Sequence, residues 1–271
     1  MILTVDIGNS NICFALHEDD SETPVFFERI HTGREKSPED YATDLRMILD
    51  LHKKATSGIT GALISSVVPP VTEAVKQGVE KVIPGKVLLM DYRLKLPFEN
   101  HASDPSCVGH DILADITGAL HQAEAPLITI DMGTATVISV VLPAGAEPSR
   151  VFPGKPSPLP SLSGVLIQAG VQTGLNSLAN DTSALPDISL KAPDKVIGRN
   201  TENGMKSGIV FGTASMIDGM IDRIEKDTGY KFTVFATGGL SRFIIPYCTH
   251  EIHWDSELLM KGLYYVLKEN R

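Results

Sequence analysis

Two short segments place a carboxylate, a glycine and hydroxyl side chains directly after an apolar run. They read Asp6-Ile-Gly-Asn-Ser10 and Asp131-Met-Gly-Thr-Ala-Thr136. Glycine in such a turn lets backbone N–H groups approach phosphate oxygens, and a Ser or Thr hydroxyl adds a donor. A carboxylate repels phosphate, so we expect Asp6 and Asp131 to hold Mg²⁺ instead. One Asp-x-Gly is also a common β-turn, but two copies at equivalent places favour phosphate binding.

A third segment adds a nucleotide to this interpretation. Phe235-Ala-Thr-Gly-Gly-Leu-Ser241 places a Gly-Gly turn after an apolar run. Such a turn would let an adenine ring lie against the backbone, where any Cβ would collide. The three segments together indicate a nucleotide-dependent phosphotransferase of the actin-like ATPase type.

The elements that must position these turns alternate between strands and helices, which predicts a layered α/β fold. Ile2–Val5 and Ile12–Leu16 read as a hairpin around the first turn, and Leu127–Ile130 and Thr136–Leu142 as a hairpin around the second. Further strands are expected at Val25–Ile30, Gly61–Val68, Lys86–Met90 and Lys231–Ala236. Helices are expected after Ser37, at Val71–Val82, Ile112–His121, Val165–Leu178 and Gly208–Glu225, and at Asp255–Lys268 with Asp255 as its cap.

The order of elements restarts near residue 125, which predicts two α/β halves. We place the first at residues 1–124 and the second at residues 125–271, with a duplication of pattern more than of sequence. The segment 143–160 is rich in proline and is expected to be a surface insertion in the second half. Trp254 is expected to be a core residue.

Composition limits the classes of partner. The net charge of −9 argues against binding nucleic acid or an anionic membrane. Three dispersed cysteines with no CxxC pair favour a reducing compartment over a disulfide framework or a zinc site. No apolar stretch suits a secretion signal or a membrane span, so a cytoplasmic location is expected.

The chain resembles the type III pantothenate kinases, the family that includes the Bvg accessory factors. The resemblance covers almost the whole length and rests on an ordered series of motifs: Asp6–Ser10, Ser65–Pro70, Gly109–Asp111, Asp131–Thr136, Ile197–Thr201 with Ser207-Gly208, and Ala236–Gly239. It implies a duplicated actin-like ATPase (ribonuclease H-like) fold, with a cleft between two α/β domains. It also implies a homodimer that transfers the γ-phosphoryl of ATP to pantothenate, the first step of coenzyme A synthesis, with Mg²⁺ and a monovalent cation (K⁺ or NH₄⁺).

The resemblance also implies roles for single residues. Asp6 and Asp131 match the metal- and phosphate-organising aspartates, and Asp111 matches the general base for the pantothenate hydroxyl. The expected phosphate- and nucleotide-binding residues are Gly8, Asn9, Ser10, Gly133, Thr134, Thr136, Gly238 and Gly239. The expected substrate-binding residues are Phe98, Gly109, His110, Asp111 and Thr182. Asp111 could instead serve only as a helix cap, since aspartate is common at helix starts.

Departures from the family pattern fall on the acceptor side. Ile112 replaces an arginine that holds pantothenate, His110 an alanine and Phe98 a tyrosine, and Gly164–Gly170 lacks a glycine and a proline of its motif. Loss of a forked guanidinium contact costs about 1.5–3 kcal/mol. An alternative is therefore a divergent paralogue that phosphorylates another small alcohol or acts as a non-catalytic regulator. A sugar or acetate kinase of the same superfamily is a third alternative.

Overall fold

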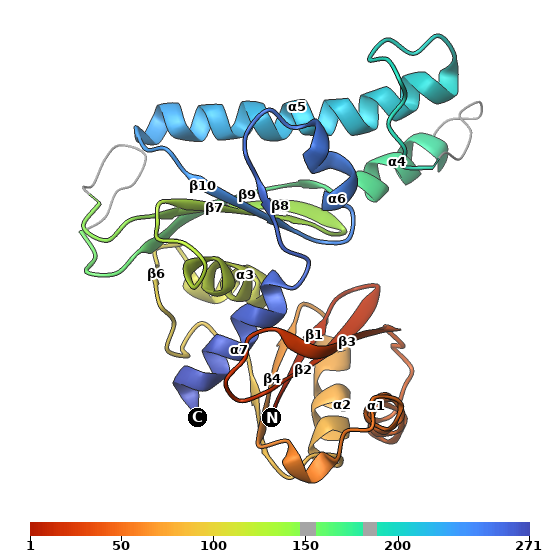
Figure 1. The fold of residues 1–271 in the computed structure, drawn as a ribbon, viewed down its shortest axis with the longest axis vertical. Helices are drawn as coiled ribbons and strands as arrows, with labels where there is room; N and C mark the ends of the chain where they lie inside the picture. The colour runs from red at the N-terminus through yellow and green to blue at the C-terminus, as the bar shows by residue number, and fades with distance from the viewer. Residues whose placement is uncertain (147–155, 181–188) are drawn as a thin grey trace. The chain divides into compact units, whose positions relative to one another are not determined.

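The computed structural model describes residues 1–146, 156–180 and 189–271 (Figure 1). It divides the chain into two compact units. Unit 1 comprises Met1–Gln122 and Glu257–Arg271, and unit 2 comprises Ala123–Ser256. The two units depart from the expected division after residue 124, because the C-terminal helix belongs to the first unit. That helix, α7 (Leu258–Asn270), packs on elements of unit 1.

Unit 1 is built on one mixed sheet with the strand order β3-β2-β1-β4-β5. Antiparallel pairing joins β1 to β2 and β2 to β3, whereas β4 and β5 continue parallel to β1. The strands of this sheet are β1 (Ile2–Ile7), β2 (Asn11–His17), β3 (Pro24–His31), β4 (Gly61–Ser66) and β5 (Lys86–Leu89). A short β6 (Glu99–Asn100) comes later in the chain and is not part of it.

Two helices cover one face of this sheet, α1 (Pro38–Leu51) and α2 (Pro69–Glu80). Ser37 begins α1 with a capping box: its hydroxyl accepts from the Asp40 N–H, and the Asp40 carboxylate accepts from the Ser37 N–H at 2.8 Å. The apolar side chains of both helices pack on alternate residues of the strands, among them Leu3, Val5 and Ile7. The other residues of β1, including Asp6, therefore point to the opposite face.

The opposite face carries α3 (His110–Leu120) and α7. The Thr4 hydroxyl of β1 contacts the Met260 sulfur of α7 at 3.4 Å, which fixes the side on which α7 lies. The two helices approach through glycine. A Cβ on Gly262 would lie 1.8 Å from the Ala114 carbonyl oxygen, and one on Gly118 would lie 2.3 Å from the Leu258 oxygen. Glycine at both positions permits a close helix crossing and so sets the position of α3.

Unit 2 is built on a second sheet in which the strands run in the order β11-β10-β7-β8-β9. The strands β7 and β8 form an antiparallel hairpin, β9 continues it, and β10 lies parallel to β7 on the other side. The strands are β7 (Leu127–Met132), β8 (Ala135–Leu142), β9 (Ser161–Ala169), β10 (Thr233–Thr237) and β11 (His253–Trp254).

The long helix α5 (Thr201–Thr228) lies along one face of this sheet (Figure 1). Asn200 caps its start by accepting from the Asn203 N–H at 2.8 Å. Gly229, with φ of +76°, ends it in the left-handed conformation that favours glycine. Its buried residues pack on one face of β7, β8 and β10. The unit also contains α4 (Val171–Asn180) and the short α6 (Ser241–Ile244).

Three local predictions are wrong. The segment 165–178 does not form one helix, because residues up to Ala169 pair with β8 and only those from Val171 are helical. Trp254 is 50% exposed and not a core residue. Helix α7 begins at Leu258 with Glu257 in the cap position, so Asp255 lies before it.

The described ends of the proline-rich insertion are joined by a hydrogen bond from the Gly145 N–H to the Ser157 oxygen at 2.7 Å.

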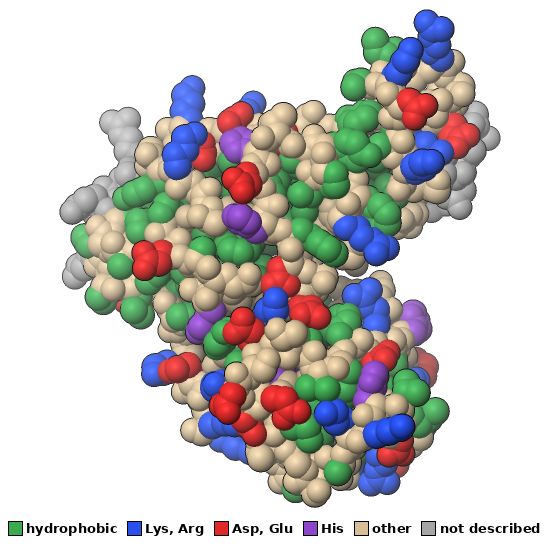
Figure 2. All heavy atoms as spheres, viewed as in Figure 1, with side chains coloured by type: hydrophobic (Ala, Val, Ile, Leu, Met, Phe, Trp, Pro, Cys, Tyr) green, Lys and Arg blue, Asp and Glu red, His purple; other side chains and the backbone are tan. Residues whose placement is uncertain are grey.

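The surface carries charges of both signs. In Figure 2, acidic and basic side chains of the described residues are interspersed with polar and apolar ones on the face shown. A search of the described ranges finds no helix with the length and hydropathy needed to cross a membrane.

Candidate active site

The first predicted phosphate turn joins β1 to β2 in unit 1. The Gly8 N–H donates to the Asn11 oxygen at 2.9 Å, which closes the turn. Thr32 holds the turn from the end of β3: its hydroxyl donates to the Gly8 oxygen at 2.7 Å and its N–H to the Ser10 oxygen at 3.0 Å. The Asn9 and Ser10 side chains are exposed. The turn is therefore fixed by backbone bonds while its polar side chains remain free to meet a ligand.

Asp6 belongs to a row of polar residues that crosses the sheet. It is register partner to Ser65 on β4 and to Cys13 on β2, and Cys13 is register partner to Arg29 on β3. Directly paired residues share a face, so all four side chains project on the face that carries α3 and α7. The row brings a carboxylate, a hydroxyl, a thiol and a guanidinium to neighbouring strands beside the first turn.

Two observations show how polar this row is. The Ser65 hydroxyl is fully buried and has no hydrogen-bond partner among the described residues. Burial and then the Asp6 carboxylate raise the pKa of the Cys13 thiol, whereas Arg29, which donates a hydrogen bond to it, acts in the opposite direction. Ser65 and Arg29 were not predicted as site residues. Strand register is the signal that finds them: Ser65 requires the pairing of β1 with β4, and Arg29 requires the pairing of β1 with β2 and of β2 with β3.

The second predicted phosphate turn joins β7 to β8 in unit 2. The Gly133 N–H donates to the Ala135 oxygen at 2.9 Å and closes this turn. The start of α4 supports it, because the Thr134 oxygen accepts from the Gly170 N–H at 3.0 Å and from the Thr173 hydroxyl at 2.8 Å. A Cβ on Gly170 would lie 2.3 Å from the Gly133 oxygen, so only glycine allows this approach. A glycine N–H thus closes both turns, but its acceptor lies three residues further along the chain in the first turn and two residues further in the second.

The Gly-Gly turn after β10 lies against the second phosphate turn. Gly238 has φ of +89°, and a Cβ there would lie 2.6 Å from the Asp131 Oδ1 and 2.6 Å from the Met132 oxygen. The Ser241 hydroxyl donates to the Gly238 oxygen at 2.6 Å and so holds the turn. A Cβ on Gly239 would meet nothing within 4 Å. The structure thus brings Asp131 and Gly238 together, as two motifs of one nucleotide site require.

Thr136 lies apart from the rest of its motif. It is register partner to Met132, whereas Asp131 is register partner to Val137, so the Thr136 and Asp131 side chains project on opposite faces of the sheet. Thr136 is fully buried on the face that carries α5. Its hydroxyl has no hydrogen-bond partner among the described residues.

Asp111, the predicted base, lies in the first turn of α3. Gly109 occupies the cap position, and a Cβ there would lie 2.3 Å from the Asp111 Oδ1. The same carboxylate accepts from the Ile112 N–H at 2.9 Å. Burial raises the pKa of Asp111, and this effect outweighs the opposing one of backbone N–H groups and the nearby His110. A carboxylate with a raised pKa is a stronger base than an ordinary aspartate.

The other expected acceptor residues divide into three groups. His110 starts α3 and lies near Asp91. The pKa of Asp91 is lowered to about 2, chiefly by Arg93 and to a smaller extent by His110. Phe98 and Ile112 are buried, at 4% and 9% exposure. Thr182 lies outside the described residues.

No cluster of three or more His, Cys, Asp or Glu side chains suited to a metal ion occurs within residues 1–146, 156–180 and 189–271.

Comparisons with known proteins cover the whole chain. The family model described as type III pantothenate kinase matches residues 2–155 and 157–223. A type III pantothenate kinase from Acholeplasma laidlawii is 33% identical over 270 residues, covering 100% of this chain and 99% of the relative. One from Exiguobacterium is 30% identical over 271 residues, with both chains covered completely.

Solved structures agree on the fold. A Baf family transcriptional activator from Campylobacter jejuni aligns with a TM-score of 0.55 at 18% identity, covering 99% of this chain and 98% of the other. The activator of 2-hydroxyisocaproyl-CoA dehydratase from Clostridium difficile, solved with bound ADPNP, aligns with a TM-score of 0.55 at 12% identity, covering 99% and 95%. These likenesses confirm the predicted two-domain actin-like ATPase fold. The family model and the relatives that are 30–33% identical over the full length establish that the chain belongs to the type III pantothenate kinase family, a family of phosphotransferases.

Proposed function

We propose that the protein transfers the γ-phosphoryl group of ATP to the hydroxyl of pantothenate, the first step of coenzyme A synthesis. Family membership over the full length supports this reaction. The structural observation that best supports this reaction is the close approach of Gly238 to the Asp131 carboxylate. This approach brings the predicted adenosine turn against the predicted phosphate turn.

The donor side needs groups that bind phosphate and metal. The N–H groups of the two glycine turns would bind phosphate oxygens, with Asn9, Ser10 and Thr134 as further polar contacts. Mg²⁺ is commonly held by one or two carboxylates together with substrate phosphates, and the family resemblance gives Asp6 and Asp131 as the carboxylates proposed for this role. When bound, Mg²⁺ neutralises charge on the transferring phosphoryl group. The unpartnered Ser65 hydroxyl beside Asp6 supports an additional polar group at that place.

The acceptor side needs a base. The pantothenate hydroxyl oxygen attacks the γ-phosphorus, the bond from phosphorus to the bridging oxygen breaks, and ADP leaves. Asp111 takes the hydroxyl proton, and its raised pKa suits this task. Gly109, His110, Phe98 and Thr182 are proposed to line the acceptor site. Ile112 is buried and aliphatic, so we assign to His110 the role of meeting the pantothenate carboxylate.

The remaining properties follow from the family resemblance and are proposals of the same kind. They are a homodimer, a requirement for a monovalent cation such as K⁺ or NH₄⁺, and a cytoplasmic location. Light scattering at micromolar concentration tests the dimer, and turnover in K⁺ against Na⁺ buffers tests the cation. The alternative of a non-catalytic regulator is not favoured, because the relatives that match over the full length are kinases.

A coupled ADP-release assay tests the proposed function. Pantothenate should give saturable turnover, and a panel of other small alcohols should give at most a few per cent of it. Asp91→Asn is a control, because Asp91 lies near His110 but is paired with Arg93. ADP-binding without turnover on any alcohol would contradict the proposal, and turnover on another alcohol alone would assign a different acceptor.

A further inference from the structure

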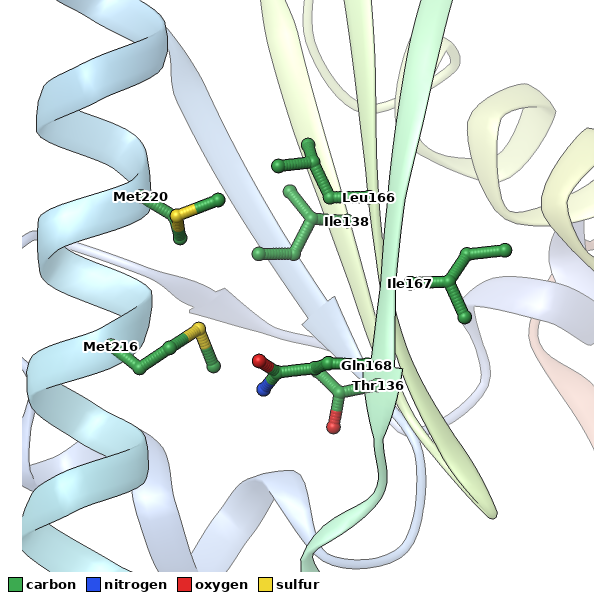
Figure 3. Close-up of a pocket in the computed structure, with 7 residues that line it drawn as sticks. All are labelled: Thr136, Ile138, Leu166, Ile167, Gln168, Met216 and Met220. Carbon is green, nitrogen blue, oxygen red and sulfur yellow. The ribbon is translucent and has the colours of Figure 1, made fainter.

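Unit 2 contains a cavity of about 320 Å³ between the sheet and α5, on the face opposite to Asp131. Figure 3 shows Ile138 and Leu166 pointing from the strands toward Met216 and Met220 of α5. Ile167 points away on the other side of β9 (Figure 3). The cavity therefore lies within one unit and is separate from the predicted phosphate turns.

One end of the cavity is polar. The Thr136 hydroxyl and the Gln168 amide lie together there, below Met216 (Figure 3). Thr136 is fully buried, and its hydroxyl has no hydrogen-bond partner among the described residues. An unpaired buried hydroxyl is unfavourable unless something else pairs with it. A polar group on a molecule inside the cavity would pair with this hydroxyl.

The lining defines the chemistry of that molecule. None of the described lining residues carries a charge. Two methionine side chains form the wall on α5, and their flexible thioethers adapt to different apolar shapes. At about 30 Å³ for each water-sized volume, the cavity has room for roughly ten non-hydrogen atoms. Its size is at the lower end of the range for small-molecule sites.

We propose that this cavity is a binding site for a small neutral amphiphile, with an apolar body against Met216, Met220 and Leu166 and one hydroxyl or amide group on Thr136. Gln168 supplies a second polar contact from the rim, where its side chain is exposed. A carboxylate is excluded because no cation lines the cavity to offset its burial. The site is independent of the proposed kinase reaction.

Methyl NMR of the full-length protein labelled at methionine tests this site. Benzyl alcohol is the probe, benzoate is the charged control, and Met216→Leu and Met220→Leu assign the two signals. Benzyl alcohol should shift both signals saturably with a millimolar or lower Kd, while benzoate leaves them unchanged. Thr136→Val should weaken binding about 3- to 10-fold, because it removes one hydrogen bond and keeps the shape.

A second variant keeps the test decisive if Thr136→Val folds poorly. Leu166→Phe should fill the cavity and abolish the shifts. Thr136→Val should also raise the melting temperature of the ligand-free protein, since it removes an unpaired buried hydroxyl. Equal shifts at all methionines, no saturation, or unchanged binding in both Thr136→Val and Leu166→Phe would overturn the proposal.

Discussion

Gly238 offers the sharpest test of the nucleotide site, through the variant Gly238→Ala. The φ of +89° would strain an L-residue by about 1–2 kcal/mol. The new Cβ would also lie 2.6 Å from both the Asp131 Oδ1 and the Met132 oxygen, and relieving such an overlap costs typically 1–3 kcal/mol. The free energy of unfolding should therefore fall by about 2–5 kcal/mol.

The same change should weaken ATP binding, because the Asp131 carboxylate must move to admit the methyl group. We expect the Kd for a fluorescent ATP analogue to rise about 10-fold or more, a cost of about 1.4 kcal/mol. Gly239→Ala is the matched control for stability, since a Cβ there meets nothing within 4 Å in the protein. Thermal unfolding measures the stability of both variants, and a binding titration measures the nucleotide affinity of Gly238→Ala. Equal free energies of unfolding for the two alanine variants would refute the assigned contact.

Three further predictions concern unit 1. His17 is fully buried, and burial lowers its pKa from 6.5 to about 4, so the unfolded chain takes up a proton first as the pH falls. Neutral His17 thus contributes about 3 kcal/mol to the free energy of unfolding above pH 6.5, and this contribution is lost between pH 6.5 and 4. Urea unfolding measured against pH should show the loss, and His17→Gln should abolish this pH dependence. Gly262→Ala should lower the free energy of unfolding by about 3 kcal/mol or more, because its Cβ would lie 1.8 Å from the Ala114 oxygen. Gly212→Ala, in open space on α5, should instead raise the free energy of unfolding by about 0.5–1 kcal/mol. Chemical denaturation measures both variants, and equal free energies of unfolding would contradict this prediction. Arg29→Gln should raise KM for MgATP about 3- to 10-fold in steady-state kinetics, because it removes the cation from the polar row, and an unchanged KM would exclude Arg29 from the site.

Local signals in the sequence predicted the hairpins well. Both glycine turns follow short apolar runs, and the structure closes each with a backbone bond from the glycine N–H. Helix α5 is longer than expected, since it begins at Thr201 and ends at Thr228. The Asn200 cap and Gly229 that set these limits are residues of the types that sequence reasoning uses.

Features that depend on distant partners could not be predicted in the same way. The run that contains Val165 has the apolar content of a helix, but it pairs with β8, and that partner lies outside any local window. The polar row of Asp6 with Ser65 and Arg29 exists only through strand register. The packing of α7 on α3 through Gly262 likewise needs a neighbour far away in the chain.

Detection of the product tests the central claim most directly. Mass spectrometry of a reaction with ATP, Mg²⁺ and pantothenate should show phosphopantothenate accumulating at one molecule per ADP released. Asp111→Asn should lower kcat by about 100-fold or more, within the range for loss of a general base, while the Kd for ATP stays within about twofold. Phosphopantothenate formed at the wild-type rate by Asp111→Asn, or ATP binding with no phosphopantothenate from the wild-type protein, would contradict the account.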